Sequence, residues 1–308
     1  MRSETTTLEH RSMFFVFTDL SVFLFPEDEY NNFQNDKEGY MCLKKKCLSE
    51  ITNKDTERII CIVCHEEAEL EDFVSPLCRE MHFVICRGCM EYLKKRKDKR
   101  EVVCPYCREK KSDKAYQEEI LGILFSRILH KTLHNIELRP DTEVKTVTKL
   151  TRETKVVLSN IAITASLFFK LLSKTAVETT NGVSLVGHDN SLGRCIGELD
   201  WRTNETARLC FDECTNEEME QVCSNIKTMP RKGIHINAKE IHAKENGVYI
   251  LLKTWGLFDG YSPDLFLRTS KKEHIEEFLE EENSSLWIGS VKGLDLRGYA
   301  VELFPKLR

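Results

Sequence analysis

Bulky apolar residues dominate the first part of the chain that has a clear pattern. Residues 13–25 interleave phenylalanine, valine and leucine with isolated polar positions, which is typical of buried strands. A secretory signal peptide is the alternative. It needs an unbroken apolar stretch, whereas Asp19 interrupts this one and the acidic residues 27–29 follow it. We therefore expect a pair of buried strands, followed by a polar connecting segment over residues 26–57.

Two later segments carry apolar residues at helical spacing. Residues 115–137 predict an amphipathic helix that ends before Pro140. Its apolar positions are Leu121, Leu124, Phe125, Ile128, Leu129 and Ile136. A second helix is expected within residues 142–173. Its charge-free run, 156–169, is shorter than the roughly 20 residues that span a bilayer, so we expect a buried helix and no membrane partner.

The remaining residues, 176–308, predict a mixed α+β domain. Turns are marked by Asn-Gly pairs at 181–182 and 246–247. Thr215 and Ser270 each stand three residues before a glutamate and ahead of an apolar segment, which predicts two helices that begin with capping boxes. Strands are predicted over the apolar runs 248–252, 286–291 and 299–304. No internal repeat is apparent, and these residues indicate no known family.

The chain thus has an α+β fold class and four predicted segments. These are a strand-rich segment with a linker (1–57), a Cys-rich module (58–112), a helical region (113–175) and the α+β domain (176–308). Of the 308 residues, 41% are apolar and 31% charged, which is typical of a folded protein. A net charge of -5 excludes a general attraction of the whole chain to nucleic acid. Residues 91–111 are nevertheless basic, and the glutamates of residues 273–282 are interpreted as the solvated face of a helix.

The 13 cysteines point to specific chemistry, because six of them form three CxxC pairs and a seventh lies among these pairs. With one histidine they form the pattern C-x2-C-x13-C-x3-H-x3-C-x2-C-x14-C-x2-C, which comprises Cys61, Cys64, Cys78, His82, Cys86, Cys89, Cys104 and Cys107. Zinc takes four such ligands in a tetrahedron, so eight ligands predict two structural zinc ions. Spacing alone leaves open which pairs share an ion. Tight pairs in a long chain argue against a disulfide framework, and reduced thiols favour a cytoplasmic or nuclear location.

The order of three cysteines, one histidine and four cysteines resembles the RING finger family over residues 61–107. The resemblance implies interleaved pairing. One zinc ion would be held by Cys61, Cys64, Cys86 and Cys89, and the other by Cys78, His82, Cys104 and Cys107. It also implies a ubiquitin ligase: the module binds a ubiquitin-conjugating enzyme charged with ubiquitin and positions the thioester for attack by a substrate lysine, without a catalytic residue of its own.

Four residues occupy positions that this family uses to bind its partner enzyme. Val63 precedes the second ligand, Pro105 follows the seventh, and Arg108 follows the eighth as a possible linchpin between enzyme and ubiquitin. Leu93 stands where many members have a tryptophan. Three residues, rather than the common one, separate Cys78 from His82. The alternative for Val63 and Leu93 is packing beneath the zinc loops, and for Arg108 a solvated charge.

Two classes of function therefore stay open. The first is a RING-type ubiquitin ligase whose domain 176–308 recruits an unknown protein substrate. The second is a non-catalytic, zinc-stabilised interaction or nucleic-acid-binding protein, for which the basic run 94–100 offers a phosphate-contacting patch. A third zinc site near Cys210, Cys214 and Cys223 is a weaker hypothesis, and we interpret these as ordinary thiols.

Overall fold

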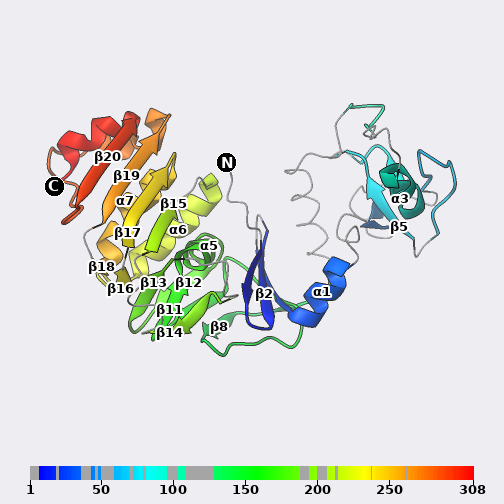
Figure 1. The fold of residues 1–308 in the computed structure, drawn as a ribbon, viewed down its shortest axis with the longest axis horizontal. Helices are drawn as coiled ribbons and strands as arrows, with labels where there is room; N and C mark the ends of the chain where they lie inside the picture. The colour runs from blue at the N-terminus through cyan, green and yellow to red at the C-terminus, as the bar shows by residue number, and fades with distance from the viewer. Residues whose placement is uncertain are drawn as a thin grey trace. The chain divides into compact units, whose positions relative to one another are not determined.

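The chain forms two compact units (Figure 1). The small unit is Glu27–His130, and the large unit combines Met1–Pro26 with Lys131–Arg308, so the chain divides at different places from the four predicted segments. The computed structural model describes residues 7–18, 21–35, 43–45, 48–49, 59–69, 72–78, 81–95, 103–108, 128–187, 194–199, 207–211, 214–236, 238–260 and 263–308. Among these residues, no helix combines the length and the apolar character that crossing a bilayer requires.

A three-stranded antiparallel sheet carries the Cys-rich segment of the small unit. Its order is β4 (Leu43–Lys44), β5 (Phe73–Pro76) and β6 (Val84–Cys86), and helix α3 (Arg87–Lys95) follows β6 directly. The predicted connecting segment 26–57 also contains a helix, α1 (Glu27–Asn35), which we did not predict. The first turn of α1 holds three acidic residues, which stabilise the positive end of the helix dipole.

In the large unit, the predicted pair of buried strands is confirmed. Strands β2 (Met13–Phe17) and β3 (Val22–Pro26) form an antiparallel hairpin, and β1 (Thr7–His10) pairs with the other edge of β2. Strand β3 pairs in turn with β9 (Thr148–Leu150), and β7 (Lys131–Thr132) completes the sheet. Strands β3 and β7, which precede and follow the inserted small unit in the chain, therefore lie in one sheet of the large unit.

The prediction of a helical region over 113–175 is wrong for most of its described part. Residues 109–127, which contain three of the predicted apolar positions, lie outside the described residues. Ile136 was expected on the first helix but lies in strand β8 (Asn135–Leu138). In place of the second helix the chain forms β9, β10 (Lys155–Leu158) and β11 (Ile161–Thr164), and only α5 (Ala165–Lys174) is helical.

Two properties of the sequence explain these strands. Valine and isoleucine are frequent in β10 and β11, and their branched Cβ atoms favour an extended backbone over a helix. Asn160 has a φ of 51°, a left-handed conformation that asparagine tolerates and that interrupts a helix. The charge-free run 156–169 is therefore strand, turn, strand and the start of α5.

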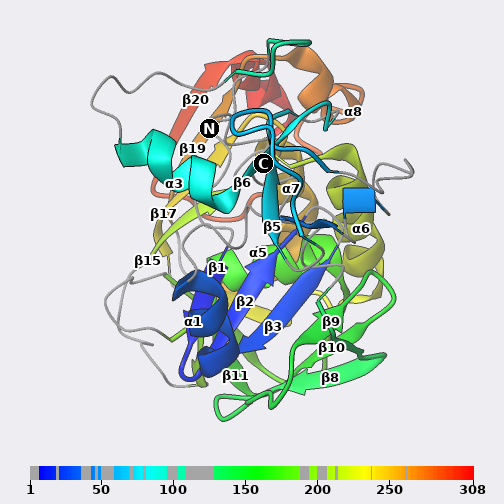
Figure 2. The same ribbon diagram turned by 90° about the vertical axis from the view of Figure 1, so that its right-hand side faces the viewer.

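Mostly parallel strands build the rest of the large unit, and most of them lie in two larger sheets (Figures 1 and 2). One runs in the order β14 (Ile196–Glu198), β11, β13 (Val183–Val186), β16 (Ile234–Ile236) and β18 (Phe258–Gly260), in which only the β14–β11 pair is antiparallel. The other is the parallel sheet of β15 (Ala207–Phe211), β17 (Ala238–Lys244), β19 (Asp264–Thr269) and β20 (Gly293–Gly298). A smaller parallel sheet contains the three strands β12 (Ala176–Thr179), β10 and β8, in that order.

A helix follows each strand of the second sheet. These helices are α6 (Asn216–Thr228), α7 (Gly247–Thr254) with the 3-10 turn η2 (Trp255–Leu257), α8 (Glu276–Leu279) after η3 (Lys272–His274), and η4 (Tyr299–Lys306). One strand and one helix per unit, stacked in parallel, is the arrangement of solenoid proteins. A single buried cluster runs through the whole large unit, from Leu8 to Leu303. The structure therefore repeats although no repeat is apparent in the sequence.

The same topology corrects three predicted strands. Residues 248–252 form helix α7, because β17 and β19 are parallel and such strands need a crossover connection between them. Residues 299–304 lie in the 3-10 helix η4, and of the predicted strand 286–291 only a bridge from Leu286 to Leu307 forms. A short apolar run fits a buried helix and a buried strand equally well.

One of the two predicted capping boxes is confirmed. The Thr215 side chain accepts a hydrogen bond from the backbone N–H of Glu218, and the Glu218 carboxylate accepts one from the Thr215 backbone at the start of α6. The second prediction, at Ser270, is wrong. The Ser270 hydroxyl and backbone N–H both donate to the Glu245 carboxylate, and α8 begins later, at Glu276.

Candidate metal centre

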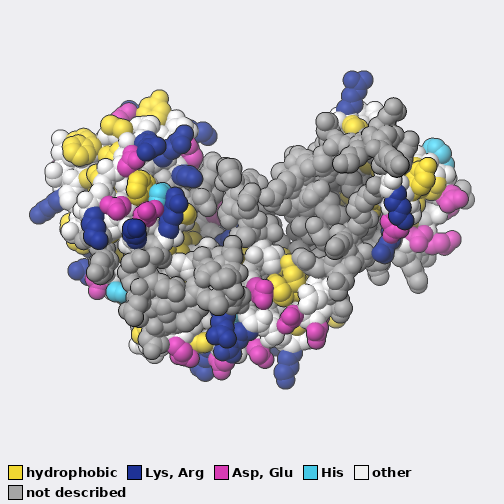
Figure 3. Space-filling view, viewed as in Figure 1, with side chains coloured by type: hydrophobic (Ala, Val, Ile, Leu, Met, Phe, Trp, Pro, Cys, Tyr) yellow, Lys and Arg dark blue, Asp and Glu magenta, His cyan; other side chains and the backbone are white. Residues whose placement is uncertain are grey.

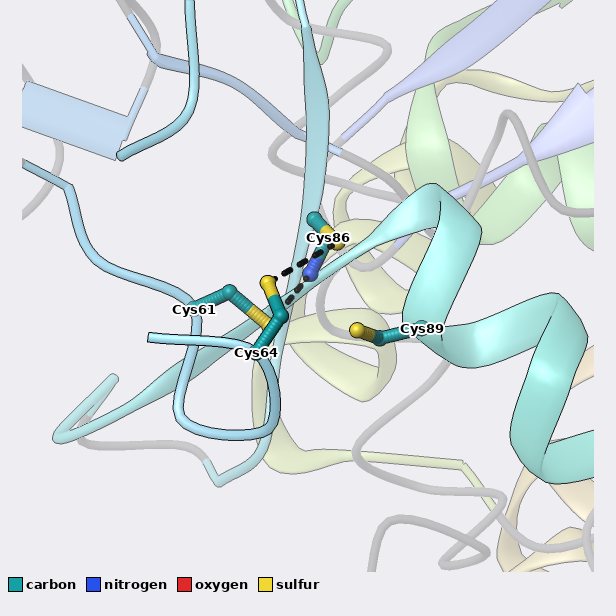
Figure 4. A group of neighbouring side chains, drawn as sticks. All are labelled: Cys61, Cys64, Cys86 and Cys89. Carbon is teal, nitrogen blue, oxygen red and sulfur yellow. Dashed lines mark hydrogen bonds between the residues drawn. The ribbon is translucent and has the colours of Figure 1, made fainter. Parts of the chain in front are cut away.

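Four thiols from separate elements converge in the first group (Figure 4). Cys61 and Cys64 lie on the turn that follows Ile60, Cys86 is the last residue of β6, and Cys89 lies in the first turn of α3. Their sulfur atoms all lie within 4.8 Å of one another. All four cysteines are free thiols, so no disulfide links them.

The second group combines three thiols with one imidazole. Cys78 and His82 flank the turn between β5 and β6, and Cys104 and Cys107 lie on a second CxxC turn. The four ligand atoms again lie within 4.8 Å of one another. Along the chain, the first ligand pair thus shares a group with the third, and the second pair, Cys78 and His82, shares the other group with the fourth. This is the interleaved arrangement that the family resemblance implied.

Both CxxC turns have the same backbone geometry. The N–H of His65 donates to the carbonyl of Cys61 over 2.8 Å, and the N–H of Arg108 donates to the carbonyl of Cys104 over 2.8 Å. His65 and Arg108 also share a left-handed backbone, with φ angles of 60° and 58°. This turn, which we call a knuckle, closes each pair so that its two sulfurs face the same point.

The distances within the groups fit a tetrahedral zinc ion. With Zn–S bonds of about 2.3 Å, two sulfurs of a tetrahedron lie about 3.8 Å apart, and the Cys64 and Cys86 sulfurs are 3.9 Å apart. A sulfur and a nitrogen on such an ion lie about 3.6 Å apart, and Nδ1 of His82 lies 3.4 Å from the Cys78 sulfur and 3.8 Å from the Cys104 sulfur. Each group can therefore hold one metal ion, and His82 would bind through Nδ1.

Backbone hydrogen bonds hold one thiol of each group close to its charged form. Burial acts to raise the pKa of Cys61, but N–H groups of Cys64, Cys86 and Val63 lower it to about 7. Burial likewise opposes ionisation of Cys104, yet the N–H groups of Cys107 and Tyr106 lower its pKa to about 6. Each group thus offers one thiolate near neutral pH, where a cation can first bind.

Three further thiols, those of Cys78, Cys86 and Cys89, are disfavoured as anions until a cation is present. Burial, and then contacts with neighbouring sulfurs, raise the pKa of Cys78 to about 12. Burial also raises the pKa values of Cys86 and Cys89, and the nearby Cys61 sulfur adds to the effect. A bound divalent ion would compensate this negative charge, so metal binding and release of protons from these thiols are coupled.

Among the described residues of the small unit, little apolar core supports the two groups. The buried residues between them are Cys61, Leu77, Cys78, Ile85, Met90 and Cys104, half of them candidate ligands. A second small cluster comprises Leu48, Ile59, Ala68, Val74 and Val84. A core of this size contributes little folding free energy, so we expect that the metal ions supply much of the stability of the small unit.

Two supporting residues were missed by sequence reasoning. The Tyr106 ring packs against the His82 imidazole with centroids 4.5 Å apart, and this contact orients the ring that presents Nδ1. Lys45, which is buried, donates to the carbonyl of Ala68 over 3.4 Å and lies 3.5 Å from the Glu67 carboxylate, beside the first knuckle. Tyr106 could have been found from its place inside a CxxC pair. Nothing in the sequence marks Lys45.

The four predicted partner-binding residues differ in exposure. Val63, Pro105 and Arg108 are exposed and lie on the knuckles. Leu93 is half-buried and packs against the small core between the metal groups, as the packing alternative anticipated. Other exposed apolar side chains of the small unit are Ile60, Phe83, Tyr92 and Tyr106. The basic run 94–100 lies largely outside the described residues.

The candidate third zinc site does not form among the described residues, which contain only the two groups above. Cys195, which lies near the proposed site in sequence, is buried and donates from its thiol to the Glu9 carbonyl, whereas Cys210 is exposed. Comparison of the chain with protein-family models, with curated proteins and with solved structures found no match. The metal centre must therefore be interpreted from its own geometry.

Proposed function

We propose that the protein is a RING-type ubiquitin ligase with two structural zinc ions. The interleaving of two four-ligand groups is the observation that carries the proposal, because this arrangement distinguishes the RING pattern from fingers with consecutive pairing. Both groups have four protein ligands and no open position, so the ions would be structural and would activate no water.

In this function the small unit binds a ubiquitin-conjugating enzyme and positions its thioester with ubiquitin for attack by a lysine. The exposed apolar residues on the knuckles, Val63 and Pro105, supply surface for the enzyme. Arg108, which is exposed directly after the last ligand, can donate hydrogen bonds to enzyme and ubiquitin at the same time. The large unit would recruit the protein substrate.

Discharge of a ubiquitin-charged enzyme onto free lysine tests the proposal. The metal-loaded full chain should accelerate discharge with at least one member of a broad panel of conjugating enzymes. Val63→Asp should weaken this effect, because it places a charge on the apolar surface while the backbone N–H of Val63 still donates to Cys61. No acceleration by folded protein with two zinc ions would exclude the ligase and leave the non-catalytic zinc-stabilised function.

The Arg108 side chain can be tested separately from its backbone. Arg108→Gly removes the guanidinium but suits the left-handed φ of 58°, so the knuckle and the metal content should persist. His65→Gly is a matched control, because His65 has the same conformation on the other knuckle. We expect slower discharge with Arg108→Gly alone. Equal effects of the two variants would show that the backbone, not the guanidinium, is responsible.

A further inference from the structure

The parallel sheet β15-β17-β19-β20 has one buried face and one exposed face. Alternate residues such as Leu209, Ile241 and Leu265, which are neighbours in register, are buried beneath the helices. The residues between them face away from the helices. Because the strands are parallel and in register, these outward side chains form straight rows across the sheet.

Three such rows cross the exposed face. The first contains Arg208, Glu240 and Asp264, the second Cys210, His242, Phe266 and Asp295, and the third Lys244, Arg268 and Arg297. Figure 3 shows dark-blue Lys and Arg side chains over this part of the large unit, with acidic and His side chains among them. Charges in the first two rows are largely paired: Glu240 lies 3.0 Å from His242, and Asp295 lies 2.7 Å from Arg297.

The third row, which we call the basic row, is compensated at only one of its three positions, because Arg297 is paired with Asp295 and, among the described residues, the other two cations are not paired. Lys244, Arg268 and Arg297 are direct register partners, so three cations occupy adjacent strands about 4.8 Å apart. Neither Lys244 nor Arg268 has a carboxylate within salt-bridge distance in the described part of the chain, and both are exposed. Like charges directly opposite each other destabilise a sheet, so the fold itself gives no reason for the row.

An aromatic platform lies beside the basic row. The Phe266 ring stacks on the His242 imidazole with centroids 4.3 Å apart and planes 5° from parallel. Both side chains are only partly buried. The imidazole is held by Glu240 through Nε2 and by Arg208 near Nδ1, at 3.4 Å. A rigid aromatic surface next to the unpaired cations of Lys244 and Arg268 is suited to a ligand that has both apolar and negatively charged groups.

We propose that this exposed face binds an acidic, extended segment of a partner protein, with its carboxylates on the basic row and an apolar side chain on the His242–Phe266 platform. The row spans about 10 Å, and carboxylates at alternate positions of an extended chain lie about 7 Å apart, so two of them can reach all three cations. Nucleic acid fits less well, because its continuous run of phosphates would also lie against Glu240, Asp264 and Asp295, whereas the peptide presents an apolar side chain to those rows. The inference stands whether or not the small unit acts as a ligase.

Fluorescence anisotropy on the full, metal-loaded chain tests the proposal. The probe is a labelled peptide with two glutamates at alternate positions and one tryptophan. It is compared with the same peptide carrying lysines in place of the glutamates and with single-stranded oligo-dT of equal charge. The peptide should bind at low salt and weaken as salt rises. Arg268→Glu should weaken binding roughly tenfold or more, because it replaces attraction by repulsion. Lys227→Glu, on the exposed side of α6 away from the sheet, is the matched control and should bind normally.

The melting temperature of the variant separates a binding role from a structural one. Arg268→Glu should melt at the same or a higher temperature than the natural chain, because it relieves the repulsion within the basic row. Lys244→Glu should show the same combination of weaker binding and unreduced stability. No binding of the peptide, equal loss with the control, a lower melting temperature in both variants, or tighter binding of oligo-dT would each overturn the proposal.

Discussion

Acidification should destabilise the large unit through one buried histidine, His10. Its side chain is 0% exposed, Nε2 lies 3.1 Å from the carbonyl oxygen of Pro140, and Nδ1 has no hydrogen-bond partner. The contact with Pro140 requires the proton on Nε2, so the neutral ring leaves Nδ1 bare. Protonation of Nδ1 would place an unpaired charge in the core. Burial, assisted by the positive charges of Arg11 and Arg194, therefore lowers the pKa of His10 from 6.5 to about 4.

The direction and size of the effect follow from the two pKa values. Between pH 6.5 and 4 the unfolded chain binds a proton at His10 that the folded chain does not, so stability falls as the pH falls through this window. The contribution is fully present above pH 6.5 and is lost below about pH 4. A difference of about 2.5 in pKa corresponds to about 3 kcal/mol, of which about 2.5 kcal/mol is already lost at pH 4.5.

Urea denaturation followed by tryptophan fluorescence measures this loss, because all three tryptophans lie in the large unit. His10→Gln does not titrate at position 10 and keeps an N–H donor for Pro140. The difference in free energy of unfolding between the natural chain and this variant is therefore free of the contribution of carboxylates, which titrate in both proteins. The free energy of unfolding of the natural chain relative to the variant should fall by about 2.5 kcal/mol from pH 7.5 to 4.5. A difference that stays constant, or an NMR titration of His10 near 6.5, would refute the reasoning.

Three further predictions concern single side chains. Cys61→Ser should reduce the zinc content, measured by metal analysis, from two ions to about one per chain. The control Cys223→Ser, in α6, should keep two ions, and two ions in Cys61→Ser would contradict the ligand assignment. Asn225→Ala should destabilise the large unit by about 3 kcal/mol, because the buried amide accepts from the Val177 N–H and donates to the carbonyls of Leu172 and Thr175. Ser224→Ala, at an exposed position of the same helix, is the control, and equal urea midpoints of the two variants would refute the expectation. Gly298→Ala should lower the free energy of unfolding by about 2–3 kcal/mol, since φ is 63° and a Cβ atom would lie 2.1 Å from the Thr269 carbonyl oxygen. Gly256→Ala, with open space around its Cβ position, should melt like the natural chain, and an equal loss of stability in both variants would argue against strain at Gly298.

The metal centre was predictable because its information is local. Each CxxC pair brings its two sulfurs together within one turn, so spacing alone identified the residues that the structure gathers into two groups. The interleaving came from resemblance, since it depends on the hairpin of β5 and β6, which carries Cys78 and His82 at its turn and Cys86 at its end. The contacts of Tyr106 and Lys45 depend on tertiary packing, which spacing does not encode.

The large unit was harder to predict because its pairings are remote in sequence. Register partners at 240, 264 and 293 in β17, β19 and β20 are separated by 24 and then 29 residues, so no fixed period appears in the sequence. Runs such as 248–252 are apolar on all sides, and only the parallel direction of the neighbouring strands decides that they are helical. The hairpin of β2 and β3 was predictable because it is sequence-local.

The insertion of the small unit between β3 and β7 has a consequence for the order of events on the ribosome. Val22 of β3 pairs with Leu150 of β9, so β3 can meet β9 only after 128 more residues have been made. At about 5–20 residues per second this takes roughly 6–25 s. The candidate metal ligands, residues 61–107, emerge during that interval, while Phe15 and Phe17 of β2 still lack most of their core. Early capture of zinc would fold the inserted segment before β9 and β7 complete the N-terminal sheet, and cells short of zinc would leave the inserted segment unfolded for longer.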